Sequence, residues 1–267
     1  AEQAGAGHFL LVEAMMGLFD AAADGTGAPA DLAATLGLPV VLVVDCSRMS
    51  QSVAALVRGY RDYRSDIHLV GVILNKVGSL RHEAMLRGAL EASGIEIFGV
   101  LERDPLLALP ERHLGLVQAG EHGMLENFIA HAATVVTRCC NLERLIAVAA
   151  RQERGRPETA VPRLPPLGQR IAIARDVAFA FTYEHLLMGW RMAGASLSFF
   201  SPLADEAPAV DADAVYLPGG YPELHGAALA NADVFRLGMQ AAARRGARIY
   251  GECGGYMALG EALVAAD

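Results

Sequence analysis

Short apolar runs alternate with amphipathic stretches along the first half of the chain. The runs occupy residues 9–13, 38–45, 68–75 and 95–101, and apolar residues with helical spacing cover 49–63 and 80–93. Near-continuous Val, Ile and Leu over the length of a strand is typical of strands buried on both faces of a parallel sheet. The repeated order of strand and helix therefore predicts an open α/β sheet.

The same pattern restarts in the second half of the chain after a break. Residues 124–150 have the apolar spacing of one helix, and residues 151–169 then carry four prolines and no apolar periodicity, as a linker would. Strands are expected at 170–174, 196–200, 214–217 and 248–250, with helices at 183–193 and 231–245. We expect two doubly wound α/β domains, residues 1–150 and 170–267, joined by the linker 151–169.

Composition narrows the class of protein. The 267 residues are 53% hydrophobic and 19% charged, which excludes a disordered or fibrous chain. A formal charge of −8 disfavours nucleic-acid binding, and no apolar run approaches the roughly 20 residues of a membrane span. Four cysteines, of which Cys139 and Cys140 are adjacent, lack the pattern of a disulfide framework. We therefore expect a cytoplasmic protein without a nucleic-acid or membrane partner.

The segment Gly251-Glu-Cys-Gly-Gly255 follows an expected strand and precedes an expected helix. This order is that of a nucleophile elbow, in which Cys253 sits on a strained turn between small neighbours. The amide of Gly254 could donate to an oxyanion, and the helix N-terminus would favour the thiolate. The alternative is a buried structural cysteine before a tight turn.

A second glycine pair, Gly219-Gly220, follows the expected strand 214–217. Ligands bind at the carboxyl ends of strands in α/β sheets, and glycines present bare backbone amides there. These amides could complete an oxyanion hole for Cys253. An ordinary glycine-rich turn is the alternative.

Several motifs together resemble one known family. Residues 217–225 (LPGGYPELH) and 252–257 (ECGGYM) look like the class I glutamine amidotransferase domain of the cobyrinic and hydrogenobyrinic acid a,c-diamide synthases. Residues 12–20, 40–45 and 109–116 are similar to the family's ATP-binding half, which resembles dethiobiotin synthetase, a P-loop-type parallel-sheet domain. The second domain would then be flavodoxin-like.

The resemblance implies ATP-dependent amidation of the a and c acetate carboxylates of a corrinoid acid in cobalamin biosynthesis. Ammonia would come from glutamine, ATP would be a cosubstrate with Mg²⁺, and a homodimer is compatible with the family. An amidotransferase acting on another tetrapyrrole, such as a nickel-sirohydrochlorin, stays open as an alternative. So do a cysteine hydrolase of the flavodoxin-like class and a non-catalytic relative.

Three polar residues end or follow expected strands in the first domain. The resemblance makes Glu13 a magnesium ligand, whereas a capping or solvated carboxylate is the alternative. Asp45 is either a second metal-site acid or the N-cap of the next helix. Asn75 matches the position that reads the nucleotide base in similar folds, and a turn former is its alternative.

Other polar residues leave their roles open. Lys76 could contact phosphate, and Asp20 could have a substrate, metal or turn role. Arg112 could pair with a substrate carboxylate, and its neighbour His113 belongs to the family motif without a derivable task. His225 is a weak candidate base for Cys253, because the family places its catalytic histidine downstream of the nucleophile.

Two elements of the family's chemistry are missing from this sequence. Lys76 is the single lysine and lies outside a Gly-x₄-Gly-Lys context, so there is no Walker A loop, and no histidine follows Cys253. We expect the P-loop and the catalytic histidine to lie beyond a chain truncated at both ends. Activity is therefore expected of the complete protein and not of these 267 residues alone.

Overall fold

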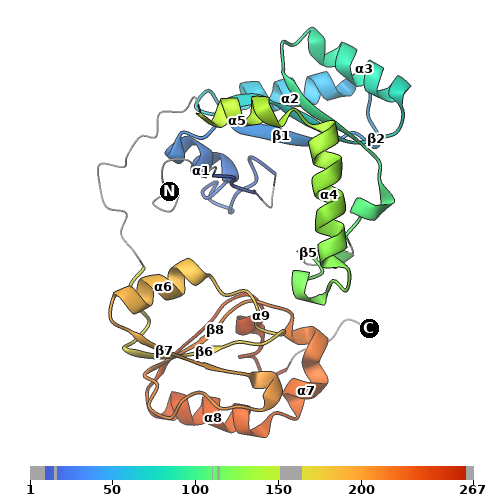
Figure 1. Ribbon diagram of the computed structural model, residues 1–267. Helices are drawn as coiled ribbons and strands as arrows, with labels where there is room; N and C mark the ends of the chain where they lie inside the picture. Colours follow the sequence, from blue (N-terminus) through green and yellow to red (C-terminus); the bar gives the residue numbers. More distant parts are fainter. Residues whose placement is uncertain (1–9, 15–16, 110, 113–114, 151–163, 263–267) are drawn as a thin grey trace. The chain divides into compact units, whose positions relative to one another are not determined.

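The structure, a computed structural model, describes residues 10–14, 17–109, 111–112, 115–150 and 164–262. Two compact units divide the chain, Ala1–Arg156 and Pro157–Asp267 (Figure 1). Most of the expected linker, at 151–163, lies outside the described residues, so its extent stays a prediction. Each unit is built on its own parallel sheet, as the alternation of strand and helix predicts.

The sheet of the first unit consists of β1 (Val40–Asp45), β2 (Leu69–Val77) and β3 (Ile97–Glu102), parallel and in that order. The helices α2 (Ser52–Tyr63) and α3 (Leu80–Glu91) connect these strands. They pack on the sheet through a shared core of Val44, Val53, Val57, Val72, Leu74, Leu86, Leu90 and Val100. Burial of apolar side chains at helical spacing thus holds the carboxyl ends of the three strands at one edge.

The expected strand at 9–13 is wrong where the structure describes it. Residues 10–14 form no regular element, and Leu11 is 81% exposed. A strand forms where a neighbour supplies partners for its N–H and C=O groups, and no described strand pairs with these residues. Apolar character over a few residues therefore does not by itself show that a strand forms.

The expected helix at 124–150 is broken into α4 (Leu125–Cys139) and α5 (Leu142–Ala150). Cys140 is extended and forms an isolated antiparallel bridge with Gly99 of β3, and the Asn141 N–H donates to Phe98 O at 2.7 Å. The Asn141 side chain then accepts from the Arg144 N–H at 3.0 Å and caps α5. The hydrogen bond to β3 and the cap of α5 replace helical hydrogen bonds that are lost where the helix is interrupted.

Smaller elements complete the first unit. They are the helix α1 (Pro29–Leu36), the 3₁₀ turns η1 (Pro105–Leu107) and η2 (Ala119–Glu121), and a hairpin of β4 (Glu111–Arg112) and β5 (Gly115–Leu116). The turn η1 is tethered to α4, because the carboxylate of Asp104 caps Leu106 N–H and lies 2.6 Å from His131 Nε2. The histidine, and then the Leu106 N–H, hold the pKa of Asp104 below its usual value.

The second unit has a four-stranded parallel sheet in the order β7-β6-β8-β9. Its strands are β6 (Arg170–Ala174), β7 (Ser196–Phe200), β8 (Ala214–Leu217) and β9 (Arg248–Gly251). Helix α6 (Glu184–Met192) covers one face and α8 (Asp233–Arg244) the other (Figure 1). Strand β8 is buried along its whole length, as its apolar sequence predicts.

Short elements follow the strands of this sheet at the edge where the strands end. They are η3 (Pro202–Ala204), η4 (Pro222–His225), α7 (Gly226–Ala230) and α9 (Gly254–Met257). With helices on both faces and strand order reversing beside β6, the unit is doubly wound, and the predicted α/β fold class is confirmed.

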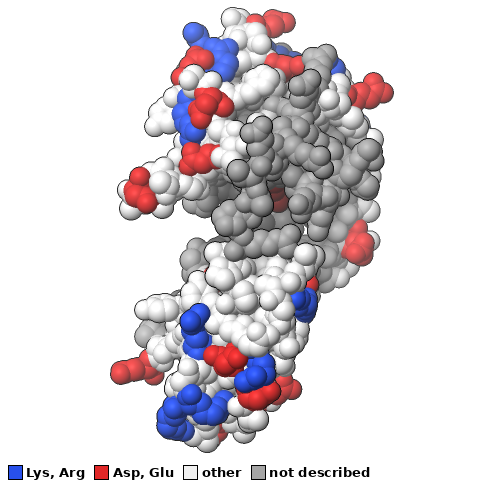
Figure 2. All heavy atoms as spheres, turned by 90° about the vertical axis from the view of Figure 1, so that its left-hand side faces the viewer, with Lys and Arg blue, Asp and Glu red and all other residues white. Residues whose placement is uncertain are grey.

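Charged side chains of both signs are interspersed on the face shown in Figure 2. Ion pairs in the described part of the chain include Arg64 with Asp31 and Asp66, in which the arginine is less than one-third exposed. Within the described ranges, no helix has the length and apolar character needed to cross a bilayer.

Candidate active site

Cys253 occupies the turn between β9 and α9 with φ +50° and ψ −123°. This left-handed φ is rare for a residue with a Cβ, and such conformations cost about 1–3 kcal/mol unless the surroundings enforce them. The thiol is free and the residue is exposed. The predicted elbow geometry is therefore present, with the cysteine at its apex.

The neighbouring glycines allow the two predicted motifs to meet. A Cβ on Gly255 would collide with the carbonyl oxygen of Leu217 at the end of β8. A Cβ on Gly219 would lie 3.2 Å from the Cβ of Cys253. The absence of side chains at these two positions thus lets the turn after β9 pack directly against the turn after β8.

Gly220 and Gly254, the two glycines predicted to hold the oxyanion, lie next to each other. Gly220 and Gly254 are buried, and a Cβ on Gly254 would lie 2.6 Å from Gly220 O. Across the described part of the chain, neither amide has a protein acceptor. The two loops therefore present N–H groups next to the Cys253 turn, as an oxyanion hole requires.

The helix after the nucleophile is shorter than the sequence pattern indicates. Helix α9 has four residues, Gly254–Met257, so it is a single turn. A macrodipole requires several aligned turns. Any stabilisation of a thiolate at Cys253 therefore comes from local N–H groups and not from a long helix dipole.

Glu252, the residue before Cys253, is anchored to the sheet. The Tyr216 hydroxyl of β8 donates to Glu252 Oε1 at 2.5 Å. Burial, followed by the hydrogen bond to Glu252, raises the pKa of Tyr216, so the phenol keeps its proton and remains a donor. Sequence patterns did not predict this contact. The available signals were a polar residue inside the glycine motif and a lone tyrosine in an apolar strand.

No imidazole completes the site among the residues that the structure describes. His225 ends η4, and no hydrogen bond joins it or another described histidine to Cys253. That His225 is not the base for Cys253 therefore stays a prediction.

In the first unit, strand ends bring Asp45, Asn75 and Lys76 together. Asp45 and Asn75 are cross-strand partners at the ends of β1 and β2. Lys76 Nζ lies 2.7 Å from Asp45 Oδ2, and the Asn75 side chain accepts from the Lys76 N–H at 2.9 Å. Lys76 has φ +56° near the end of β2, where the pairing with β3 shifts register between Leu74 and Val77.

The carboxylate of Asp45 is already occupied by protein donors. Besides Lys76, the Ser47 N–H donates to Asp45 Oδ1 at 2.9 Å in the turn that follows β1. These donors, Lys76 first, hold the pKa of Asp45 far below its usual value. The N-cap alternative for Asp45 is wrong, because α2 begins at Ser52 with Gln51 as its N-cap. The metal role of Asp45 stays a prediction.

The described residues provide only part of a magnesium site. They contain no group of three or more His, Cys, Asp or Glu side chains that could bind a metal ion. Glu13 is exposed in an irregular segment and does not end a strand. Mg²⁺ in nucleotide sites is held by one or two carboxylates plus phosphates and water, so Glu13 stays a predicted ligand.

Of the remaining candidate residues, Asp20 lies in a turn, and the side chains of Arg112 and His113 are not described. The Asp20 carboxylate accepts from the Gly17 N–H at 3.0 Å, and the Asp20 N–H donates to Gly17 O, which favours its turn role. His113 lies outside the described residues, and the side chain of Arg112 in β4 is likewise not described. Cys46 is fully buried in the core of the first unit.

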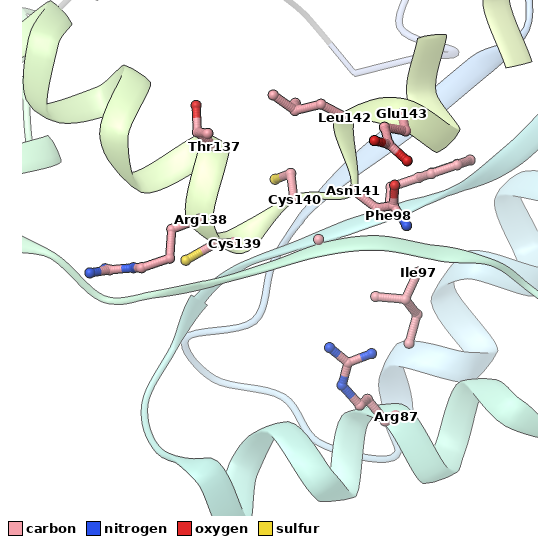
Figure 3. Close-up of a pocket in the computed structure, with 11 residues that line it drawn as sticks. Arg87, Ile97, Phe98, Thr137, Arg138, Cys139, Cys140, Asn141, Leu142 and Glu143 are labelled. Atoms are coloured by element: carbon pink, nitrogen blue, oxygen red, sulfur yellow. The ribbon is translucent and has the colours of Figure 1, made fainter. Parts of the chain in front are cut away.

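A cavity of about 570 Å³ lies beside β3, away from these strand ends (Figure 3). Residues at the α4–α5 break, including Cys139 and Cys140, line one side and Arg87 of α3 the other. Its β3 lining is Ile97–Gly99, the amino-terminal half of the strand. The cavity therefore does not coincide with the carboxyl edge that carries Asp45 and Asn75.

Comparisons with known proteins match both units. Residues 13–117 match the CobQ/CobB/MinD/ParA nucleotide binding domain, and residues 170–267 match the CobB/CobQ-like glutamine amidotransferase domain. No solved structure matches the chain.

Three curated relatives of this chain share the name hydrogenobyrinate a,c-diamide synthase. A hydrogenobyrinate a,c-diamide synthase of Sinorhizobium sp is 66% identical over 99% of this chain, and that of Rhizobium meliloti is 65% identical over 98%. The synthase of the same name from Mesorhizobium japonicum is 47% identical over 98% of the chain. The chain spans about 60% of the length of these relatives. With nucleotide-binding and amidotransferase domains matched in order, the chain belongs to the cobyrinic and hydrogenobyrinic acid a,c-diamide synthase family.

Proposed function

We propose that the protein carrying this chain is a glutamine-hydrolysing amide ligase that converts the a and c acetates of hydrogenobyrinic acid to amides. The observation that carries the proposal is Cys253 at φ +50°, packed against Gly219 within a glutamine amidotransferase domain. The relatives are named for hydrogenobyrinate, which favours this acid over cobyrinic acid as the substrate.

The amidotransferase half would act by covalent catalysis. The Cys253 sulfur attacks the carboxamide carbon of glutamine, and the amides of Gly220 and Gly254 hold the developing oxyanion. The C–N bond breaks, ammonia leaves with a proton from a general acid, and water hydrolyses the γ-glutamyl thioester to glutamate. Exposure of Cys253 and the free amides beside it support this sequence of steps.

The nucleotide-binding half would supply the activated acid. ATP with Mg²⁺ phosphorylates the substrate carboxylate, because a free carboxylate is too poor an electrophile for ammonia. In this half, Asn75 is the proposed contact to the base and Glu13 the proposed magnesium ligand. The position of Asn75 at the carboxyl end of β2 supports the first role, since ligands bind at this edge in open α/β sheets.

Exchange of the nucleophile in the complete protein tests the proposal. Cys253→Ser should abolish amidation driven by glutamine and leave amidation driven by free ammonia, because carboxylate activation takes place in the other domain. Cys139→Ser, at the end of α4, is the matched control and should behave like the parent.

The assay separates the two nitrogen donors and the possible acids. Amide products are followed by mass spectrometry with hydrogenobyrinic acid, cobyrinic acid and a nickel-sirohydrochlorin as substrates. Retained glutaminase activity in the serine variant would remove Cys253 from the mechanism. Turnover of the nickel compound in preference to both corrinoid acids would replace the proposed substrate.

A further inference from the structure

A buried tyrosine lies directly beneath the turn that carries Cys253. Tyr216 is 1% exposed, with its ring edge-on to Trp190 at 5.6 Å and stacked on Tyr250 at 5.9 Å. These aromatic neighbours restrict the ring to one orientation. Its hydroxyl consequently points a fixed donor at Glu252 Oε1, 2.5 Å away.

Glu252 is held at three points around the turn. Its N–H donates to Leu217 O at 3.2 Å, its C=O accepts from the Gly255 N–H at 2.8 Å, and its carboxylate accepts from Tyr216. The first two contacts are backbone bonds that any residue could make. The carboxylate bond to Tyr216 is the one that depends on the identity of the side chain.

We propose that Tyr216 is a positioning residue for Cys253, acting through Glu252, in the glutaminase step of the proposed function. Cys253 needs its positive φ to present the sulfur, and the surroundings must enforce that conformation. Tyr216 fixes the residue immediately before the cysteine to the centre of the sheet, and so fixes the direction in which the turn leaves β9.

The same hydrogen bond controls where a negative charge lies. The Glu252 carboxylate belongs to the residue next to the nucleophile, and a thiolate forms at that nucleophile during catalysis. Tyr216 holds the carboxylate against β8 and takes up part of its charge. A released carboxylate would be free to approach the sulfur and repel the thiolate.

A double-mutant cycle in the complete protein tests the link. Tyr216→Phe removes the hydroxyl and keeps the ring, and Glu252→Ala removes the acceptor. We expect each to lower glutaminase kcat about tenfold, with KM for glutamine changed less than about twofold. The double variant should be no slower than Glu252→Ala, because both changes remove one interaction. Glu252→Gln keeps an acceptor and should retain more kcat than Glu252→Ala.

Two controls separate positioning from folding. Tyr250→Phe removes the hydroxyl of the stacked neighbour, which is 45% exposed, and should match the parent. Ammonia-driven amidation should stay at the parental rate in every variant, because it uses the other domain. Parental kcat in Tyr216→Phe, or losses that simply add in the double variant, would overturn the inference.

Alkylation of Cys253 provides a readout that does not depend on turnover. The rate of its reaction with iodoacetamide, followed by peptide mass spectrometry, should fall in Tyr216→Phe, which releases the Glu252 carboxylate, and stay parental in Tyr250→Phe. Equal rates in all variants would overturn the positioning role. Absence of glutaminase activity in the parent would instead refute the proposed function, while the alkylation rates would still test Tyr216.

Discussion

Gly255→Ala is the change that most directly tests the packing of the elbow. Gly255 has no left-handed φ, so the substitution adds no backbone strain. The new Cβ would instead collide with the carbonyl oxygen of Leu217 and come within 2.6 Å of Pro218 O. Both obstacles are backbone atoms at the end of β8, which cannot rotate away as a side chain would. The turn after β9 must therefore move away from β8.

The expected magnitude follows from this steric conflict. Overpacking a closely packed site costs about 1–3 kcal/mol. For a unit of roughly 100 residues, each kcal/mol lowers Tm by about 4–8 °C. Misplacement of a catalytic group by about 1 Å costs on the order of 10²-fold in rate. Gly255→Ala should therefore lower Tm of the second unit by several degrees and glutaminase kcat about a hundredfold.

Calorimetry and a glutaminase assay on the complete protein measure the two effects. Gly189→Ala in α6 is the matched control, because a Cβ there meets no atom within 4 Å. It should stabilise the fold by about 0.5–1 kcal/mol through helix propensity and leave activity unchanged. If Gly255→Ala retained parental Tm and kcat, the contact between the elbow and β8 would not be what shapes the site.

Three further changes probe the first unit. Glu13→Gln should weaken amidation with either nitrogen donor and spare glutamine hydrolysis, because a charged ligand of Mg²⁺ is lost; parental kinetics would return Glu13 to a structural role. Asn141→Ala should destabilise by about 1 kcal/mol in urea unfolding through loss of the α5 cap, unlike Asn127→Ala on exposed α4. Because Lys76 and Ser47 N–H depress the pKa of Asp45, its contribution to stability is complete above pH about 4 and declines as pH falls further. Lys76→Met should raise that pKa in a carboxyl NMR titration, and an unchanged titration would contradict the pairing.

The distribution of apolar residues was sufficient to predict most of both sheets. Ala214–Leu217 is buried along the whole of β8, a state that leaves a continuous apolar signature, and the apolar run of β1 also forms a strand although Val43 is 59% exposed. The elbow was predictable for a related reason. Small residues around a nucleophile on a strained turn are a local requirement, and local requirements are visible in a short stretch of sequence.

Interactions across long sequence separations were not predictable in this way. The break between α4 and α5 depends on the approach of Cys140 to Gly99, 41 positions earlier, and apolar spacing alone continues through it. Residues 10–14 show the converse case, in which strand-like composition finds no partner in the described sheet.

By itself, then, the sequence determined the α/β class and the glycine-flanked turn that carries Cys253, because these follow from periodicity and local sterics. Only the tertiary structure decided that Asp45 is bound by Lys76 and that Tyr216 anchors Glu252. Each of these contacts joins side chains more than 30 positions apart. They form because parallel strands align their carboxyl ends, and that alignment is a property of the assembled sheet.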